Sequence, residues 1–350
     1  MLMTAITFPD ALKNGDKIAI CAFSSGVESI FHPRLERVLS GLTRRGYQVV
    51  EGKCLRQQSS PAKQRADELM AFLLDDSIAA IMPPWGGELA MEVLPYLDFN
   101  AIKKARPKWL VGFSDISTLA CTLTAKCGWT TLHCTNLMQL HPSEEDTHCL
   151  QVFKTLELAA GGEFTQTPAQ FYQSDAINYA QTPDALFSLT QPSQWRCLNV
   201  KDNREVELSG RLFGGCLDTL GLLLASPFLA LDEFKKQYAS HGLVLYLENA
   251  ELHPSALARF LIALKLNNVF SDINGLIIGR SGVISAPEQT IDYYQALTLA
   301  LGECLFPVII DADIGHIAPN LCLVNGARVR MLAKLENTVV CKAQITTYFG

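Results

Sequence analysis

The chain has 350 residues, of which 49% are hydrophobic and 18% are charged, and its formal net charge is −6. So large an apolar fraction excludes an intrinsically disordered chain, and the length predicts two domains or one large one. The mildly acidic balance, with no basic stripe, excludes nucleic acid as the expected partner.

The first 160 residues alternate short apolar runs with amphipathic stretches. The apolar runs, which predict strands, are KIAICAF (17–23), YQVVEG (47–52), IAAIM (78–82), KWLVGF (108–113) and TTLHCTN (130–136). The stretches that predict helices are 33–46, 61–76, 88–97 and 116–127. This alternation with continuous apolar strands predicts a parallel sheet that is covered on both faces.

The pattern weakens between 161 and 209, where Gln, Pro, Ser and Asn are frequent, and we interpret this part as a linker with a substrate-facing loop. Beyond it, strands are predicted over 243–248, 275–279 and 306–311, helices over 254–266 and 287–301, and short strands over 327–344. We therefore predict an N-terminal α/β domain (1–160) and a separate C-terminal domain (210–350).

Cysteine usage and the lack of targeting segments predict a cytoplasmic protein. The eleven cysteines are scattered and form no CxxC pair, so neither a disulfide framework nor a zinc site is expected. The first residues do not have the form of a signal peptide, and no apolar run reaches the length of a membrane span. Without a nucleotide fingerprint or a metal-spaced cluster, we expect no cofactor and no metal.

Ser114 stands between a buried run and a helical stretch in KWLVGFSDIS (108–117). A serine at this turn lies at the carboxyl end of the sheet, where open α/β sheets bind ligands. In hydrolases the turn exposes the serine oxygen, and the next amide, here that of Asp115, can stabilise an oxyanion. Because Ile116 replaces the second glycine of G-x-S-x-G, a helix N-cap at Ser114 or Asp115 stays open as the alternative.

Two further residues could complete a catalytic set with Ser114. His316 lies in DADIGHIAPN, in a loop just past a predicted strand, and Glu248 ends the apolar run LVLYLE. An imidazole could act as the base that a serine nucleophile needs, and a carboxylate could orient it. The alternatives are a solvated histidine and a carboxylate in water or at a helix cap, and Glu251 is the nearby competitor.

Two glycine pairs could bring backbone N–H groups close to a ligand. In PPWGGE (83–88), we expect one oxyanion donor at Gly86 or Gly87 and the other at Asp115. A tight turn that enters a helix is the alternative interpretation. FGGC (213–216) carries the second pair, with the same ambiguity.

The motifs together resemble those of the LD-carboxypeptidase and microcin-immunity (MccF-type) serine peptidases. The shared stretches, in the family's order, are GDKIAICAFSS, AAIMPPWGGELAMEVLPYLDF, KWLVGFSDISTLA, TLHCTN, GRLFGGCLDTL, LVLYLENAE, GLIIGRSG and DADIGHIAPN. The resemblance implies an α/β fold: an N-terminal class I glutamine amidotransferase-like parallel-sheet domain plus a C-terminal swivelling β/β/α domain, with the active site between them. It also implies a homodimer.

The resemblance implies a catalytic triad of Ser114, Glu248 and His316, with backbone oxyanion donors at Gly87 and Asp115. The family's usual reaction removes the terminal D-alanine of murein tetrapeptides during peptidoglycan recycling in the cytoplasm. The MccF-type branch instead hydrolyses peptidyl-nucleotide antibiotics related to microcin C. The sequence leaves the choice between these substrates open.

Some positions depart from the family's pattern. Trp85 stands where many LD-carboxypeptidases have an arginine, and Cys216 stands where asparagine is usual. The stretch PSQWRCLNVKDNRE is closer to the MccF-type branch, in which an aromatic side chain there stacks on a nucleobase. Trp195 is therefore a candidate substrate-binding residue beside Trp85 and Gly86, and packing of Trp195 on its own domain is the alternative.

Two other function classes stay open. One is a catalytically silent ligand-binding protein on the same scaffold, in which the three side chains are misaligned. The other is a hydrolase that uses Cys121 or Cys127 as nucleophile, although both lie inside a predicted helix and not at its start.

Overall fold

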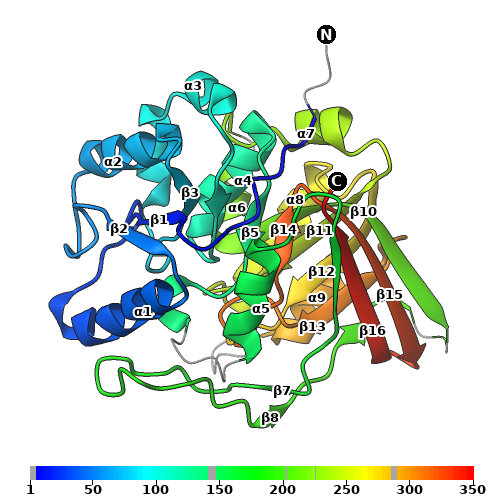
Figure 1. Ribbon diagram of the computed structural model, residues 1–350. Coiled ribbons are helices and arrows are strands. Elements are labelled where there is room, and N and C mark those ends of the chain that lie inside the picture. Colours follow the sequence, from blue (N-terminus) through cyan, green and yellow to red (C-terminus); the bar gives the residue numbers. More distant parts are fainter. Residues whose placement is uncertain (1–4, 141–146, 201, 203, 225, 285–289) are drawn as a thin grey trace.

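The computed structural model describes residues 5–140, 147–200, 202, 204–224, 226–284 and 290–350. Two sheets organise the chain, one in each half, and in Figure 1 the N-terminal half (blue to cyan) lies to the left of the C-terminal sheet. No helix in these ranges is both long and apolar enough to cross a membrane.

The N-terminal half contains a four-stranded parallel sheet with the strand order β2-β1-β3-β4. Its strands are β1 (Lys17–Ile20), β2 (Gln48–Glu51), β3 (Ile78–Ile81) and β4 (Trp109–Leu110). Its helices are η1 (Ser29–Phe31), α1 (His32–Arg44), α2 (Ala62–Leu74), η2 (Ala90–Tyr96), α3 (Phe99–Lys104), α4 (Ile116–Cys127), η3 (Leu137–Gln139) and α5 (Thr147–Leu156), where η marks a 3₁₀ helix.

Alternate residues of β1 pack on opposite sides of this sheet. Ile18 and Ile20 belong to the apolar cluster that includes Leu35 of α1, whereas Ala19 packs with Leu69 of α2. Helices α1 and α2 therefore cover opposite faces of the sheet, as Figure 1 also shows. The predicted parallel sheet with two covered faces is confirmed.

The C-terminal half contains a mixed sheet of eight strands, in the order β15-β10-β11-β12-β13-β9-β16-β6. The four parallel strands are β10 (Glu205–Cys216), β11 (Leu243–Glu248), β12 (Ile273–Gly279) and β13 (Val308–Ala312). The antiparallel strands are β6 (Glu163–Gln166), β9 (Arg196–Cys197), β15 (Arg328–Glu336) and β16 (Val339–Tyr348). Because β15 pairs with both β10 and β16, the pairing of strands runs around a closed ring.

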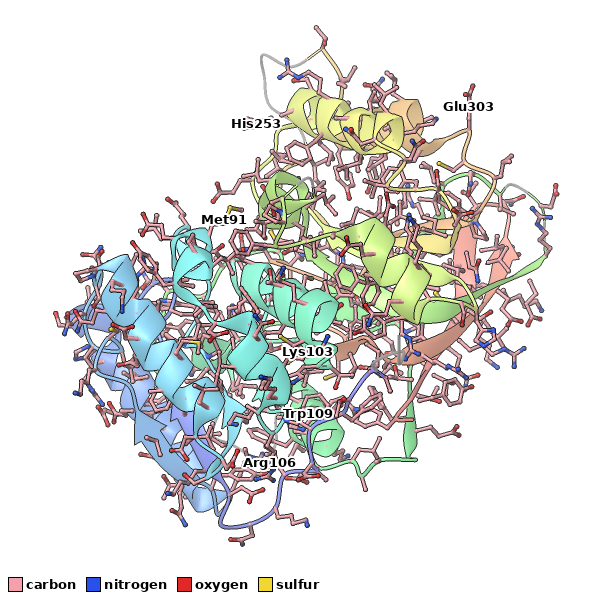
Figure 2. All side chains as sticks on the ribbon, turned by 90° about the horizontal axis from the view of Figure 1, so that it is seen from above. Met91, Lys103, Arg106, Trp109, His253 and Glu303 are labelled. Atoms are coloured by element: carbon pink, nitrogen blue, oxygen red, sulfur yellow. The ribbon has the colours of Figure 1, made fainter. Side chains whose placement is uncertain are left out.

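Helices α6 (Leu217–Leu223), α7 (Leu231–Tyr238), α8 (Pro254–Leu266) and α9 (Tyr293–Leu301) accompany this sheet. Residues 287–289 of the helix predicted over 287–301 lie outside the described residues. Figure 2 shows side chains filling the space between helices and sheets, with Lys103, Arg106 and Glu303 among the exposed charged groups at the surface. Trp109 is completely buried, and its indole N–H donates to Asp10 O at 3.1 Å.

The segment 161–209 is more than a linker with a loop. Strands β6 and β9 join it to the C-terminal sheet, and β10 already begins at Glu205. The sequence pattern did not predict these strands, because each is short and the segment is polar. Polar side chains are common in a strand such as β6, which lies at the edge of its sheet and faces water. Between them, β7 (Phe171–Tyr172) and β8 (Gln191–Pro192) form a small hairpin that extends along the lower side of the molecule in Figure 1.

Several contacts tie the halves together, and two of them involve backbone groups far apart in the chain. The tip of the 161–209 segment lies on α1, where the buried Arg34 donates to the carbonyl oxygens of Pro183 (3.0 Å) and Ala185 (3.2 Å). Strand β5 (Thr131–His133) of the N-terminal half pairs with β14 (Leu323–Asn325), which lies close to the end of the chain. The two halves therefore share backbone hydrogen bonds as well as side-chain packing.

A buried arginine holds the loops next to β1. Arg65 of α2 is 2% exposed, and its Nη1 donates to Phe23 O (2.6 Å) and Leu89 O (3.1 Å). Its Nη2 pairs with Glu92 at 2.6 Å, although the Glu92 side chain is 51% exposed. The carbonyl contacts join the loop after β1 to the loop that carries Gly86 and Gly87.

We expect Arg65→Met to destabilise the protein much more than Glu92→Gln. The first change leaves several buried carbonyl groups without a donor and should cost about 3 kcal/mol or more. The second removes only a half-exposed charge and should cost less than about 1 kcal/mol. Urea unfolding followed by circular dichroism measures both, and equal losses would show that the ion pair, not the carbonyl contacts, carries the stabilisation.

Candidate active site

Ser114 sits in a strained turn between β4 and α4. Its backbone is left-handed, with φ of 65°, which is uncommon for a residue other than glycine. Gly112, at φ +133°, has no room for a side chain, because a Cβ there would lie 2.5 Å from Asn136 Oδ1. The sharp turn leaves the Ser114 side chain only half-buried. Of the two residues in the capping alternative, Asp115 is the N-cap of α4, although its side chain makes no capping bond, and Ser114 is not the cap.

The structure brings Ser114, His316 and Glu248 together. His316 Nε2 lies 3.0 Å from Ser114 Oγ, and His316 Nδ1 lies 2.9 Å from Glu248 Oε2. Glu248 is the last residue of β11, and His316 lies in the loop that follows β13. A hydroxyl, an imidazole and a carboxylate in this order form the relay of a serine hydrolase. The Glu251 alternative is wrong for this contact, because Glu248 is the carboxylate that meets the imidazole.

Gly215 allows α4 to pack directly on β10, whereas Gly214 allows close approach to the backbone of Tyr246 in β11. A Cβ at Gly215 would lie 2.6 Å from Ser117 Cβ, so only glycine permits this approach. Ser117 Oγ accepts from the N–H of Cys216 at 3.1 Å. Cys216 in turn lies opposite Glu248 in the parallel register of β10 and β11. The second glycine pair thus sets the distance between the turn at Ser114 and the buried glutamate.

Glu248 and His316 shift each other's pKa. Burial of the completely shielded Glu248 favours its neutral form, but the charge and hydrogen bond of His316 outweigh burial, so the pKa of Glu248 lies below its ordinary value. Burial likewise lowers the pKa of His316, and Glu248 more than compensates, so the pKa of the imidazole lies above its ordinary value. The pair therefore stabilises the imidazolium that forms when His316 takes a proton.

A second histidine lies behind the first. The His133 ring is buried, and Phe113 packs edge-on between it and His316, with centroid distances of 6.1 and 4.9 Å. Burial lowers the pKa of His133 to about 4. His133 Nε2 has no hydrogen-bond partner among the described residues. This neutral ring and Phe113 form an apolar wall behind His316.

The Asp115 side chain has a role that the sequence analysis missed. It is 1% exposed and accepts hydrogen bonds from Ser24 Oγ (2.5 Å), Ala90 N (2.8 Å) and Thr118 Oγ1 (3.1 Å). Burial raises the pKa of this carboxyl. By joining three segments, Asp115 fixes the loop before η2 next to the start of α4. From sequence, the position of Asp115 directly after Ser114 predicts a role for its backbone amide, and no pattern predicts the role of its carboxylate.

Gly86 borders the space next to the Ser114 hydroxyl. A Cβ at Gly86 would lie 2.9 Å from both Ser114 Oγ and the Asp115 amide nitrogen. The neighbouring Gly87 is left-handed, with φ of +139°, and a Cβ there would meet the hydroxyls of Ser24 and Ser25. The absence of a side chain at Gly86 therefore leaves room for a small group next to the Ser114 hydroxyl and the Asp115 amide. An oxyanion formed by attack of Ser114 would need space at this point.

The other predicted binding residues lie elsewhere. Trp195 is 1% exposed, and its indole N–H donates to Asp313 Oδ2 at 3.2 Å, so it packs on its own domain, as the alternative interpretation has it, and presents no face to a nucleobase. The pairing of β9 with β13 draws it into the core of its own domain. Trp85 is half-buried, donates to Gly26 O at 3.1 Å and packs edge-on against Phe31.

Neither cysteine of the thiol alternative is suited to attack a substrate. Cys121 and Cys127 are both buried within α4. Burial raises the pKa of Cys127 to about 12 and also raises the pKa of Cys121. Both thiols therefore stay protonated at neutral pH, and a protonated thiol is a poor nucleophile.

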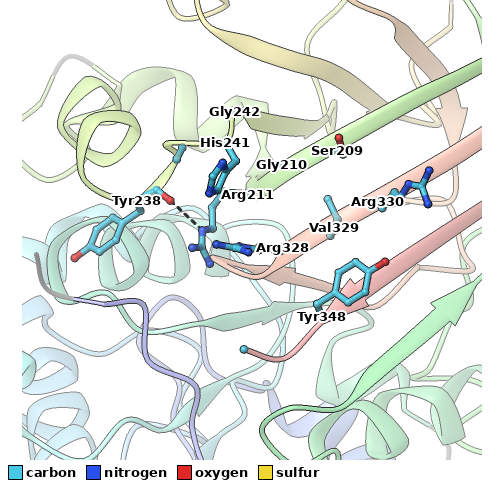
Figure 3. Close-up of a pocket in the computed structure, with 12 residues that line it drawn as sticks. Ser209, Gly210, Arg211, Tyr238, His241, Gly242, Arg328, Val329, Arg330 and Tyr348 are labelled. Atoms are coloured by element: carbon cyan, nitrogen blue, oxygen red, sulfur yellow. Dashed lines mark hydrogen bonds between the residues drawn. The ribbon is translucent and has the colours of Figure 1, made fainter.

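A hollow of about 440 Å³ lies at the opposite end of the C-terminal sheet (Figure 3). Arg211 and Arg328 are among the residues that line it, and Arg211 Nε donates to Tyr238 O at 3.1 Å. Arg211 pairs with Leu243 at the start of β11, whereas Glu248 ends that strand. This hollow is therefore separate from the Ser114–His316–Glu248 relay.

Two family models cover both halves of the chain. The model of the LD-carboxypeptidase N-terminal domain matches residues 18–134, and that of the C-terminal domain matches residues 209–331. The chain belongs to the LD-carboxypeptidase family. In this family member, Ser114 comes from one matched half, and Glu248 and His316 come from the other.

Individual relatives of this LD-carboxypeptidase family member are distant. It is 25% identical over 340 residues to the microcin C7 self-immunity protein MccF of Escherichia coli, across 95% of each chain. It is 25% identical over 344 residues to a probable murein peptide carboxypeptidase of Bacillus subtilis, across 97% of this chain and 95% of that one. The solved structure of MccF with glutamyl sulfamoyl guanosine has the same fold, with a TM-score of 0.80 at 23% identity, over 97% of this chain and 98% of that one.

We expect Glu248→Gln to lower the pKa of His316, because the carboxylate is what holds that pKa above its ordinary value. The ion pair of Glu248 and His316 stabilises the fold most at pH values between the lowered pKa of Glu248 and the raised pKa of His316. It is lost in acid as Glu248 is protonated and in base as His316 loses its proton. NMR titration of the ring signals measures the shift, and His133 is the internal control, since it should not titrate between about pH 6 and 8 in either protein. An unchanged His316 pKa would rule out the coupling.

Proposed function

We propose that this protein is a serine carboxypeptidase of the LD-carboxypeptidase type, which hydrolyses the amide bond before the terminal D-amino acid of murein tetrapeptides. The observation that carries the proposal is the relay, in which His316 Nε2 lies 3.0 Å from Ser114 Oγ and His316 Nδ1 lies 2.9 Å from Glu248 Oε2. Membership of the LD-carboxypeptidase family and the similarity to a probable murein peptide carboxypeptidase support the substrate class.

In the proposed mechanism, Ser114 Oγ attacks the carbonyl carbon of the scissile amide while His316 Nε2 takes the hydroxyl proton. Glu248 accepts the hydrogen bond from Nδ1 and stabilises the imidazolium. The amides of Gly87 and Asp115 stabilise the tetrahedral oxyanion, and His316 then gives its proton to the leaving amine. Water, activated by the same imidazole, attacks the acyl-enzyme and releases the acid, which returns Ser114 to its starting state.

All three proposed catalytic side chains come from one chain, so the relay needs no partner subunit. The exposed fraction of the His316 side chain is 37%, which leaves one side of the ring open to a substrate. The silent-scaffold alternative requires a misaligned relay, and both relay distances lie within hydrogen-bond range. Action in the cytoplasm and assembly as a homodimer stay predictions.

Peptidyl-nucleotides are a second candidate substrate, favoured by the similarity to MccF over 95% of each chain. Solved structures of MccF hold glutamyl sulfamoyl guanosine or adenosine monophosphate. Burial of Trp195 counts against this candidate, since the residue expected to stack on a base has no free face. Trp85 is no substitute for an arginine in binding a carboxylate, so the terminal carboxylate of a murein peptide needs another partner.

We expect Ser114→Ala to lower kcat by about 10³-fold or more without changing the unfolding transition, because it removes the nucleophile and no buried contact. A fluorophosphonate probe should label the parent protein, and should label neither Ser114→Ala nor His316→Ala. Ser40→Ala, at an exposed position on α1, is the matched control and should be labelled and active like the parent. Hydrolysis by Ser114→Ala at the parent rate would refute the nucleophile assignment.

A side-by-side assay should distinguish the two substrates. We expect release of D-alanine from a murein tetrapeptide with a kcat/KM at least about tenfold above that for an aspartyl-sulfamoyl adenosine. Both are followed by chromatography under the same conditions, with Ser114→Ala as the blank. A preference for the nucleotide would instead make the MccF-type reaction the function of this chain.

A further inference from the structure

The hollow of Figure 3 lies where strands β10, β15 and β16 meet the turn before β11. Its volume of about 440 Å³ is typical of sites that bind small molecules. Arg211, at one wall, pairs with Leu243 at the start of β11, and Glu248 ends that strand. The rise of a strand therefore puts the hollow roughly 16 Å from the relay, so the two are independent sites.

Two arginines face each other in this hollow. Arg328 of β15 pairs with Arg211 of β10 on one side and with Tyr348 of β16 on the other. Directly paired residues project from the same face of a sheet, and Figure 3 shows the two guanidinium groups side by side. Burial lowers the pKa of Arg211, and the charge of Arg328 lowers it further. Like charges in this position destabilise a sheet, so the pair needs a counter-charge.

The described part of the chain supplies no counter-charge to this pair. No Asp or Glu is among the residues that line the hollow, and no carboxylate of the described residues lies within 4.0 Å of either guanidinium. Arg330, the third arginine of the hollow, differs, because Glu207 accepts two hydrogen bonds from it at 2.9 and 3.0 Å. Two neighbouring positive charges thus stay unbalanced in a chain whose net charge is −6.

Both unbalanced arginines have N–H groups available for a ligand. Arg211 donates from Nε to Tyr238 O at 3.1 Å and from Nη1 to Gly326 O at 2.6 Å. These bonds hold the guanidinium in place, and its Nη2 forms no hydrogen bond with any described residue. The exposed side chain of Arg328 forms no hydrogen bond within the described ranges. Guanidinium groups placed in this way suit an anion that accepts several hydrogen bonds at once.

We propose that this hollow binds the phosphate group of a small phosphomonoester. Such a group carries roughly two negative charges at neutral pH, which the two arginines can balance, whereas a carboxylate or a sulfate ester carries one. Its oxygens accept the paired hydrogen bonds that guanidinium groups donate. The hydroxyls of Ser209 and Tyr348 and the exposed ring of His241 line the same space and add further donors.

A small ligand suits the surroundings better than nucleic acid or an anionic membrane. A long polyanion needs further basic groups around the two arginines, but Arg330 is already paired with the half-exposed Glu207. It would also approach a chain whose net charge is −6. The hollow has room for one phosphate and a small organic part, which can pack on the half-buried ring of Tyr348.

The test compares phenyl phosphate with phenyl sulfate, which has nearly the same shape and carries about one charge fewer. Calorimetric titrations of the parent protein are run at constant ionic strength, so that screening is equal for both ligands. We expect saturable one-to-one binding of phenyl phosphate, at least about tenfold tighter than that of phenyl sulfate. Affinities within about twofold of each other, or no saturation by phenyl phosphate up to about 10 mM, would overturn the proposal.

Arg328→Gln tests whether the ligand binds in this hollow. The variant removes a charge that repels Arg211, so its urea midpoint should not fall, and phenyl phosphate should bind about tenfold or more weakly. Lys334→Gln is the matched control, because it removes an exposed positive charge from β15 outside the hollow. It should bind phenyl phosphate within about twofold of the parent. Parent-like affinity in Arg328→Gln would refute the site.

A second readout distinguishes this hollow from the relay, where a phosphate ester could also bind. Labelling of the parent protein by a fluorophosphonate is timed with and without saturating phenyl phosphate. We expect equal rates, because the two sites lie at opposite ends of β11. Slower labelling, together with undiminished binding by Arg328→Gln, would place the anion at the relay and refute the proposal. The calorimetric comparison does not depend on whether the protein is a peptidase.

Discussion

The geometry of the relay depends on the close packing of α4 against β10. Gly215 carries no side chain, so the helix that begins just after Ser114 lies directly on the strand beside β11, and Cys121 Sγ reaches Gly214 O at 3.0 Å. Ser117 is three residues from Ser114, and its hydrogen-bond partner Cys216 is in register with Glu248. The packing of α4 on β10 therefore also joins the two halves, and it helps to set how far the nucleophile lies from the carboxylate.

Around this contact, the protein holds several arrangements that are unfavourable in isolation. Ser114 has a left-handed backbone, and the next residue in the chain, Asp115, carries a buried carboxylate. Glu248 carries a second, completely buried carboxylate. The surroundings stabilise both carboxylates: the imidazole of His316 stabilises Glu248, and three hydrogen-bond donors stabilise Asp115. The buried Arg65 holds the adjoining loops through their carbonyl oxygens. Such concentration of strain and buried charge is characteristic of catalytic sites, where rigid surroundings keep the reacting groups aligned.

The parts of the site that were predictable from sequence lie at strand ends. Ser114 follows β4 of the N-terminal sheet, whereas Glu248 and His316 lie at the carboxyl ends of β11 and β13 of the C-terminal sheet. In open α/β sheets, ligands bind at these strand ends. The sequence left the role of Trp195 open, because its burial depends on β9, a two-residue strand that no periodicity reveals. The packing role of the glycines in FGGC could not be predicted from sequence either. Close packing of a helix and a ligand-binding turn both require glycine, so the residue type does not distinguish them.

The sequence by itself determined the alternation of strands and helices, the two-sided burial of the N-terminal sheet and the residue types at the strand ends. Those features follow from local hydrogen bonding and from the periodic placement of apolar side chains, which act over a few residues. Only the tertiary structure decided that His316 meets both Ser114, 202 residues away, and Glu248, 68 residues away. Distances between residues on different strands depend on how helices and sheets pack, and no local pattern in the chain encodes them.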